Sequence, residues 1–314
     1  MTRYHGFIGL ALFSLAALSP AQNSGRTATP VAQTAAGAAS RAEAGHCSEA
    51  LPVLAKASGH LTDKELEKRV DLDGVRCATL LQRWSQLADF VRALQHEFPG
   101  DPEALYAAVH AWSDLSTHAA EELAHTAPTS IPALELDAEA NEVQGRWDEA
   151  ERDYRTILKQ DARYPGVHFR LARLLLSRPN PPSDFQEQAK KELQEELKIN
   201  PSDAGAEYVS GELAGQMQDF PAAAEHFSRA KVLEPNFGDA YLGLGMALLS
   251  EKKYEEAVAP LETAVKLEPE NPAGHYNLAT AYARTGRKEA AAREFALQQQ
   301  TAQHGNPQGG TSPQ

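Results

Sequence analysis

The feature that most limits how this chain can fold is a sequence period of 34 residues. Five consecutive segments align with one another, and the second needs a five-residue insertion, Arg178 to Pro182. Self-similarity at a period of about 20–50 residues is typical of chains built from one repeated supersecondary unit. The five segments are 131–164, 165–203, 204–237, 238–271 and 272–302.

Each segment has a small residue at its eighth and twentieth positions and a bulky one at its twenty-fourth. Small side chains at two fixed places allow two helices of a hairpin to cross closely, and the bulky residue fills the space beside the crossing. The small residues are Ala138, Ala172, Gly211, Gly245 and Ala279 at the eighth position, and Ala150, Ala189, Ala223, Ala257 and Ala291 at the twentieth. The bulky residues are Tyr154, Leu193, Phe227, Leu261 and Phe295.

The ends of the expected helices carry their own signals. Pro201, Pro235 and Pro269 recur at the thirty-second position, where proline ends a helix because it lacks an N–H donor. Asp219 precedes Phe220-Pro221, which predicts an N-cap followed by proline in the first helical turn. A single hairpin cannot bury its own apolar face, so consecutive hairpins must stack.

These positions resemble the tetratricopeptide repeat family, over roughly residues 131–300. The resemblance implies an all-α fold, a right-handed superhelical solenoid of antiparallel helix pairs. Asp137 and Ser210 depart from the family pattern at the seventh position, and Pro260 departs from it inside a second helix. The best-matching segment carries Tyr241, Leu244, Gly245, Tyr254, Ala257, Leu261, Ala264 and Pro269 at the signature positions.

The N-terminus is typical of a secretory signal. Arg3 precedes an apolar run, Gly6 to Leu18, and Ser19-Pro20-Ala21 supplies small residues for cleavage. We therefore expect a signal peptide over residues 1–21 and an exported protein, periplasmic or extracellular. The alternative is an uncleaved anchor. Once the signal is removed, no later segment is apolar enough to predict an integral membrane protein.

The remaining segments divide as follows. Residues 22–45 are rich in Ala, Gly, Ser and Thr with almost no large apolar side chain, which predicts a disordered linker. Residues 46–130 are expected to form degenerate helical repeats, with 102–130 as a shortened hairpin broken near Ser113 to Thr117. The tail 303–314 is expected to be disordered.

Two cysteines, Cys47 and Cys77, lie 30 residues apart in candidate helices. In an oxidising compartment they can form a disulfide, and the alternative is two unpaired buried thiols. Their number and spacing do not fit a zinc or thioredoxin-type site.

Composition and motifs argue against several functions. The net charge of −13 argues against a nucleic-acid partner, because nucleic-acid binding needs clustered Lys and Arg. The sequence contains no nucleophile elbow and no phosphate-binding loop, and so predicts no catalytic residue and no cofactor. His110, Asp114 and His118 are spaced for one helical face, but a solvated polar surface explains them better than a metal site.

The family resemblance places a peptide-binding groove on the first helices of the repeats, at positions 2, 5, 6, 9, 12 and 13. An apolar ladder flanked by arginines suits an extended or helical peptide. The alternatives are that the apolar side chains pack within the array and that the arginines pair with local glutamates. The expected groove residues are Phe169, Arg170, Arg173, Tyr208, Glu212, Leu242, Met246, Tyr276, Asn277 and Arg284.

The sequence therefore predicts a non-enzymatic scaffold or adaptor that binds protein or peptide partners in the cell envelope. A first alternative is a component of a machine that assembles envelope polysaccharide or the outer membrane. A second is a cryptic metal-dependent enzyme around His110 and His118.

Overall fold

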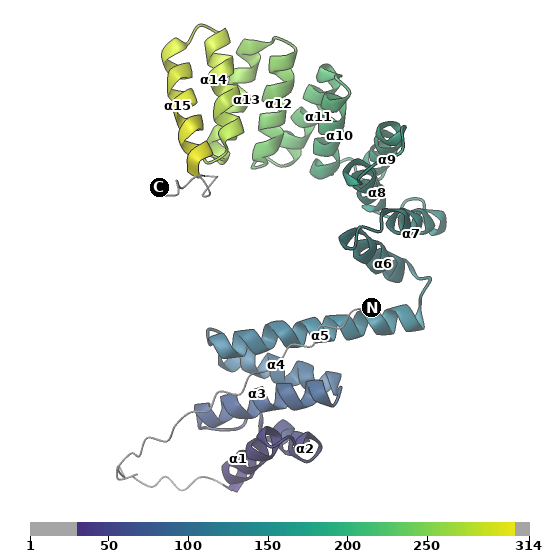
Figure 1. Ribbon diagram of the computed structural model, residues 1–314, viewed down its shortest axis with the longest axis vertical. Helices are drawn as coiled ribbons and strands as arrows, with labels where there is room; N and C mark the ends of the chain where they lie inside the picture. Colours follow the sequence, from purple (N-terminus) through teal and green to yellow (C-terminus); the bar gives the residue numbers. More distant parts are fainter. Residues whose placement is uncertain (1–29, 305–314) are drawn as a thin grey trace, which may run out of the picture. The chain divides into compact units, whose positions relative to one another are not determined.

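The computed structural model describes residues 30–304, and these form helices joined by turns, with no strand (Figure 1). The expected signal peptide, residues 1–21, lies outside the described residues, as does most of the expected tail. The chain divides into two compact units, and the boundary between Glu121 and Glu122 falls inside one long helix.

The N-terminal unit consists of two helix pairs and the greater part of this long helix. Its core is made largely of alanine, leucine, valine and the two cysteines. The helices are α1 (Pro30–Glu43), α2 (Cys47–Ala57), α3 (Lys64–Leu80), α4 (Trp84–Glu97) and α5 (Pro102–Thr126).

The C-terminal unit contains five successive helix pairs, one in each of the five aligned segments. Each pair packs against the next, and the buried apolar residues form two clusters, one over α6–α10 and one over α11–α14. The pairs are α6 (Ile131–Val143) with α7 (Trp147–Gln160), α8 (Val167–Ser177) with α9 (Phe185–Ile199), α10 (Ala204–Gln216) with α11 (Phe220–Leu233), α12 (Gly238–Ser250) with α13 (Tyr254–Leu267), and α14 (Pro272–Arg284) with α15 (Lys288–His304).

One turn geometry joins the two helices in six of the seven pairs. A residue in the left-handed region follows the first helix, and the next residue donates its N–H to a carbonyl five positions earlier. This is a Schellman turn, which satisfies the last carbonyls of the first helix. The left-handed residues are Gly45, Gln82, Gly145, Gln218, Lys252 and Gly286. The exception is the pair α8–α9, where the predicted insertion lengthens the connection.

The expected small residues lie in the core. Ala150, Ala189, Ala223 and Ala257 are fully buried, and Ala291 is nearly so. The predicted N-cap is also present, because the Asp219 side chain accepts a hydrogen bond from the Ala222 N–H.

The expectation of a disordered linker at 22–45 is wrong for the part that the structure describes. Residues 30–43 form helix α1, which packs on α2 and α3. Its buried residues are Ala35, Ala38, Ala39 and Ala42, spaced on one helical face. Alanine has the highest helix propensity and lets backbones approach closely, so a face without large side chains still forms a helix and packs.

The expectation of a shortened hairpin at 102–130 is also wrong. Helix α5 runs without a break from Pro102 to Thr126. The Thr117 hydroxyl donates to the Ser113 carbonyl, so this side chain is satisfied inside the helix. No glycine or proline occurs between Pro102 and Pro128, and the weak helix propensity of single polar residues was not enough to end the helix.

Helix α10 offers a matched test of the close helix crossing. A β-carbon added at Gly211 would lie 2.8 Å from a ring carbon of Phe227, whereas one added at Gly215, one turn later, would meet no atom within 4 Å. We expect Gly211→Ala to lower the free energy of unfolding by about 1–3 kcal/mol through overpacking. Gly215→Ala should raise it by about 0.5–1 kcal/mol, because alanine favours the helix. Urea denaturation of the two variants checks the opposite signs, and a stabilising Gly211→Ala would contradict the assigned crossing.

Candidate functional site

The candidate site lies on the first helices of the C-terminal unit, α8, α10, α12 and α14, which we call the first-helix face. Its apolar ladder is unevenly exposed. Tyr276 and Met246 are 54% and 47% exposed, Phe169 and Tyr208 are half-buried, and Leu242 is buried. The alternative that ladder residues pack within the array therefore applies to Leu242, and partly to Phe169 and Tyr208.

Four of the predicted groove residues meet in one pocket between α10, α11 and α12. The pocket has a volume of about 380 Å³. Its walls are mainly apolar, and two carboxylates stand among its polar groups. The predicted residues in it are Tyr208, Glu212, Leu242 and Met246, and the other lining residues include Gly211, Gly215, Phe220, Phe227, Asp239 and Gly243.

Two of the glycines in this pocket are explained by internal packing. Added β-carbons at Gly211 and Gly243 would lie within 3 Å of the Phe227 ring. The space beside Gly215 has no such neighbour and opens into the pocket. Gly215 and Asp239 occupy the twelfth and second repeat positions, which the family resemblance already places on the groove, so a signal for both was present in the sequence.

The pocket is electrically negative. The Tyr208 hydroxyl donates to Glu212 at 3.0 Å. Burial raises the pKa of Tyr208, and the carboxylates of Glu212, Asp239 and Glu268 raise it further. Burial and then Glu268 raise the pKa of Asp239. Among the described residues, no basic side chain forms an ion pair with any of these three carboxylates.

The arginines of the first-helix face lie outside this pocket, and each has a local partner. Arg170 forms an ion pair with Glu139 of the preceding helix pair, as the alternative of local pairing predicted. The Arg173 guanidinium lies 5.8 Å from the centre of the Phe169 ring, within cation–π range. The structure thus places Phe169, Arg170 and Arg173 together at α8, separate from the pocket at Tyr208.

The remaining predicted residues lie at the C-terminal end of the array. Asn277 donates to the carbonyl of Ala273 within its own helix. Arg284 lies over the ring of Tyr254 at 5.6 Å. Tyr276 is exposed and contacts Phe295 edge-on. None of these three residues lines the pocket at Tyr208.

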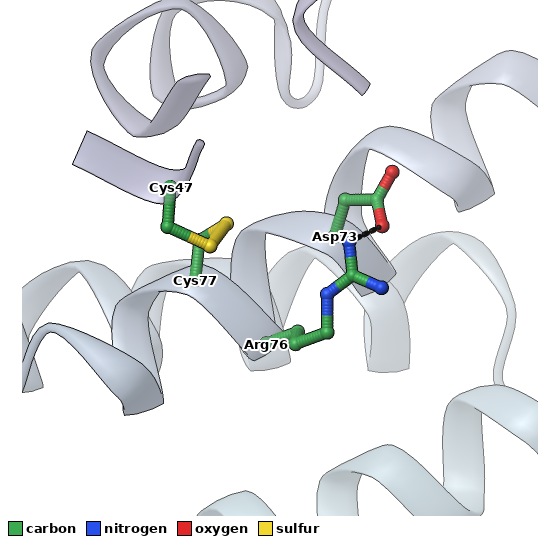
Figure 2. Close-up of a disulfide and its surroundings, with 4 residues drawn as sticks. All are labelled: Cys47, Asp73, Arg76 and Cys77. Atoms are coloured by element: carbon green, nitrogen blue, oxygen red, sulfur yellow. Dashed lines mark ion pairs between the residues drawn. A yellow bond between two sulfur atoms is a disulfide. The ribbon is translucent and has the colours of Figure 1, made fainter. Parts of the chain in front are cut away.

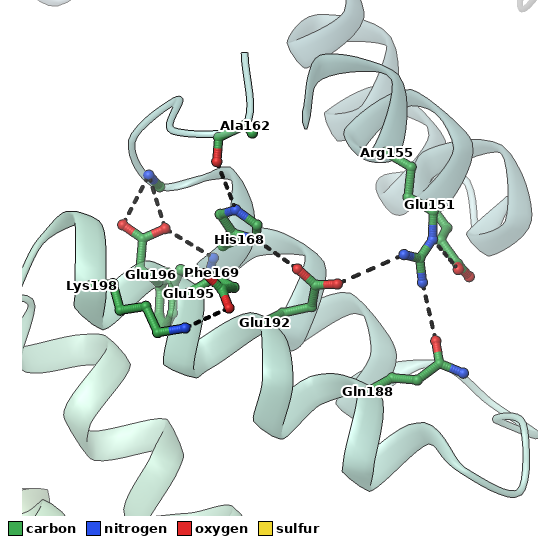
Figure 3. A network of polar contacts seen from close by, with 11 residues as sticks. Glu151, Arg155, Ala162, His168, Phe169, Gln188, Glu192, Glu195, Glu196 and Lys198 are labelled. Carbon is green, nitrogen blue, oxygen red and sulfur yellow. Dashed lines mark hydrogen bonds and ion pairs between the residues drawn. The ribbon is translucent and has the colours of Figure 1, made fainter. Parts of the chain in front are cut away.

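A buried polar network behind the first-helix face joins successive helix pairs (Figure 3). Glu196 accepts from the backbone N–H groups of Gly166 and Phe169, which fixes the start of α8. His168 Nδ1 lies 2.6 Å from Glu192, and Arg155 of the preceding pair approaches the same carboxylate. The hydrogen bond to Glu192 raises the pKa of His168. This network sets the position of Phe169 and Arg170 on the surface.

The same histidine–glutamate contact recurs at the fourth and twenty-third repeat positions. His275 pairs with Glu294 at 2.7 Å, and in the segment 204–237 the residues are exchanged, with Glu207 and His226 also 2.7 Å apart. Sequence reasoning missed these pairs, although the shared positions were a usable signal. They join the two helices of a pair and so hold the array that supports the site.

The histidines considered for a metal site lie in the N-terminal unit. The unbroken helix α5 does place His110, Asp114 and His118 at intervals of four residues. However, the His118 ring stacks on Trp84 at 4.4 Å. Within residues 30–304, no group of three or more His, Cys, Asp or Glu side chains is arranged to hold a metal ion.

No helix among residues 30–304 has the length and hydropathy needed to cross a bilayer.

Comparison with known families and structures agrees with the fold. Residues 138–204 match the family described as tetratricopeptide repeat, and residues 245–286 match one described as TPR repeat. No curated protein sequence matches the chain.

Several solved structures are similar. A MamA structure has a TM-score of 0.51 at 19% identity, covering 58% of this chain and 98% of MamA. MamA 41-end from Desulfovibrio magneticus RS-1 has a TM-score of 0.50 at 18% identity, covering 55% and 96%. YrrB, described as a TPR protein with an unusual peptide-binding site, has a TM-score of 0.51 at 16% identity, covering 58% and 92%. At these identities the likeness concerns the fold alone. The two family matches identify tetratricopeptide repeats within the array α6–α15, and the similar structures share its fold of stacked helix pairs.

Proposed function

We propose that this protein is an exported, non-enzymatic scaffold that binds a segment of a partner protein on its first-helix face, in the cell envelope. The observation that carries the proposal is the open pocket at Tyr208, with exposed apolar side chains at Met246 and Tyr276 on the same series of helices. Apolar pockets at regular spacing anchor alternate side chains of a bound peptide. The description of YrrB as a peptide-binding TPR protein adds support by analogy of fold.

Export is supported by two features. The N-terminal residues have the order of charged, apolar and small residues that a secretory signal needs. The N-terminal unit contains a disulfide between Cys47 and Cys77, and disulfides persist mainly in oxidising compartments. Cell fractionation and N-terminal sequencing test this part. We expect an envelope or secreted protein that begins near Gln22, and recovery of an intact N-terminus in the cytoplasm would contradict it.

Binding on the first-helix face can be tested by crosslinking and affinity capture from an envelope extract. The test variant replaces Phe169, Tyr208 and Tyr276 by alanine. The matched control replaces Leu80, Val232 and Leu297, three exposed apolar residues outside the proposed groove, by alanine. Circular dichroism establishes that both variants are folded. We expect mass spectrometry to show partners that the control retains and the test variant loses. Equal recovery of the same partners by both variants would show that the first-helix face is not the binding surface.

A further inference from the structure

The pocket at Tyr208 has a chemical preference that can be read from its walls and its rim. Leu242, Phe227 and Phe220 supply apolar surface, and the Met246 side chain is exposed at its edge. Glu212 and Asp239 are exposed carboxylates that line the same pocket. A ligand that fills this pocket must therefore place apolar atoms next to two negative charges.

The negative charge is not neutralised by the chain itself. None of the residues that line the pocket is Lys, Arg or His. The arginines on the first helices α8 and α14 have other partners: Arg170 pairs with Glu139, Arg173 lies over Phe169, and Arg284 lies over Tyr254. The third carboxylate that acts on Tyr208, Glu268, accepts a hydrogen bond from Asn271, which is neutral. The site thus retains an uncompensated negative charge that a cationic ligand would balance.

Aromatic rings favour the same ligand. Tyr208 lies against Phe227 and Phe237, with ring centres 5.6 Å and 4.8 Å apart. The face of an aromatic ring attracts ammonium and guanidinium groups, and the aliphatic stems of Lys and Arg pack on apolar surface while their charged ends reach the rim. An anionic segment would meet repulsion from Glu212 and Asp239.

We infer that the pocket between α10, α11 and α12 binds a basic peptide segment, in which Lys or Arg stands beside an apolar residue. This inference rests on the proposed function and specifies the partner of the same surface. The apolar residue occupies the space beside Gly215, and the cationic group lies at the rim between Glu212 and Asp239.

The first experiment uses a random twelve-residue peptide library displayed on phage and selected on the full chain. We expect the enriched peptides to contain Lys or Arg next to Leu, Met, Phe or Tyr. Enrichment of acidic peptides, of apolar peptides without a basic residue, or of no peptide at all would overturn the inference.

The second experiment measures the affinity of the most enriched peptide, labelled with fluorescein, by anisotropy. Glu212→Gln combined with Asp239→Asn should raise Kd by about tenfold, since two rim charges are lost. Gly215→Trp should raise it at least as much by filling the pocket. The matched control is Glu187→Gln combined with Glu289→Gln, which removes two exposed charges outside the pocket and should change Kd by less than about twofold. Unchanged Kd in both pocket variants would overturn the inference.

The outcomes separate the two proposals. Peptides that lack Lys and Arg, and that lose binding to the Phe169, Tyr208 and Tyr276 variant, would leave the first-helix face as a binding surface and refute its preference for cations. Peptides that bind equally to every first-helix variant would refute both.

Discussion

Replacing Cys47 and Cys77 by alanine is expected to lower the free energy of unfolding of the N-terminal unit by about 3–4 kcal/mol. The disulfide joins α2 to α3 across a sequence separation of 30 residues, and both cysteines are buried (Figure 2). Without this link the unfolded chain gains the freedom of an open loop, while the folded state loses a buried contact. The C-terminal unit contains no cysteine and should keep its stability.

The tryptophans allow the two units to be followed separately. Trp84 and Trp112 lie in the N-terminal unit and Trp147 lies in the C-terminal one. In a Trp147→Phe background, fluorescence during urea denaturation therefore reports on the N-terminal unit alone. Dithiothreitol should shift this transition in the protein with its cysteines and leave the double alanine variant unchanged. Equal midpoints for the oxidised and reduced protein would contradict a stabilising disulfide.

The second large effect comes from Asp71 on α3, a fully buried acid whose two oxygens have no hydrogen-bond partner in the described structure. Burial, with smaller contributions from Glu67 and Glu97, raises its pKa to about 7. The Ser58 hydroxyl lowers the pKa in part, without reaching full hydrogen-bond geometry. By contrast, the buried Glu67 accepts from the N–H groups of Gly59 and Leu61.

The raised pKa of Asp71 predicts that the N-terminal unit is more stable in mild acid than in mild base. Between the ordinary value of 3.8 and about 7, the folded state holds a proton that the unfolded state has released, so stability falls as pH rises and the loss is complete above about pH 7. The full pKa shift corresponds to about 4 kcal/mol of unfolding free energy. Of this, about 2–3 kcal/mol is lost between pH 5 and pH 8.

Asp71→Asn tests this prediction because it keeps the shape of the side chain and removes its charge. At pH 8 we expect the free energy of unfolding of the variant to rise by about 1–3 kcal/mol, because the cost of burying an ionised carboxylate exceeds the cost of burying an unpaired amide. The difference between pH 5 and pH 8 should shrink by about 2–3 kcal/mol. Asp89→Asn, an exposed charge on α4, is the control and should change stability by less than about 0.5 kcal/mol. An undiminished pH dependence in Asp71→Asn would assign the effect to other groups.

The repeat positions made the C-terminal unit predictable. Alanine or glycine at the eighth and twentieth positions, together with a bulky residue at the twenty-fourth, defines a helix crossing by size alone. The structure buries these residues there, except Phe295, which is half-buried. The same register placed Tyr208, Glu212, Leu242 and Met246 on one surface, where they line one pocket. A repeat position has the same role in every helix pair, because each pair repeats the same local packing.

The N-terminal unit was harder to predict because its signals are not local. Helix α1 buries only alanines, and a sequence rich in alanine has the composition of a linker. Only its packing against α2 and α3 in the folded structure shows that this face belongs to the core. The continuity of α5 through Ser113 to Thr117 depends on cooperative helix formation, which outweighs the weak preferences of single polar residues.

The sequence by itself determined the helix pairs, their register and the face that each first helix presents, because these follow from residue size and spacing along the chain. Only the tertiary structure decided which charges are neutralised. It pairs Arg170 with Glu139, leaves Glu212 and Asp239 without a cation, and buries Asp71 without a partner. The reason is that electrostatic partners are set by distances between side chains on different helices, and a one-dimensional pattern of charges does not contain those distances.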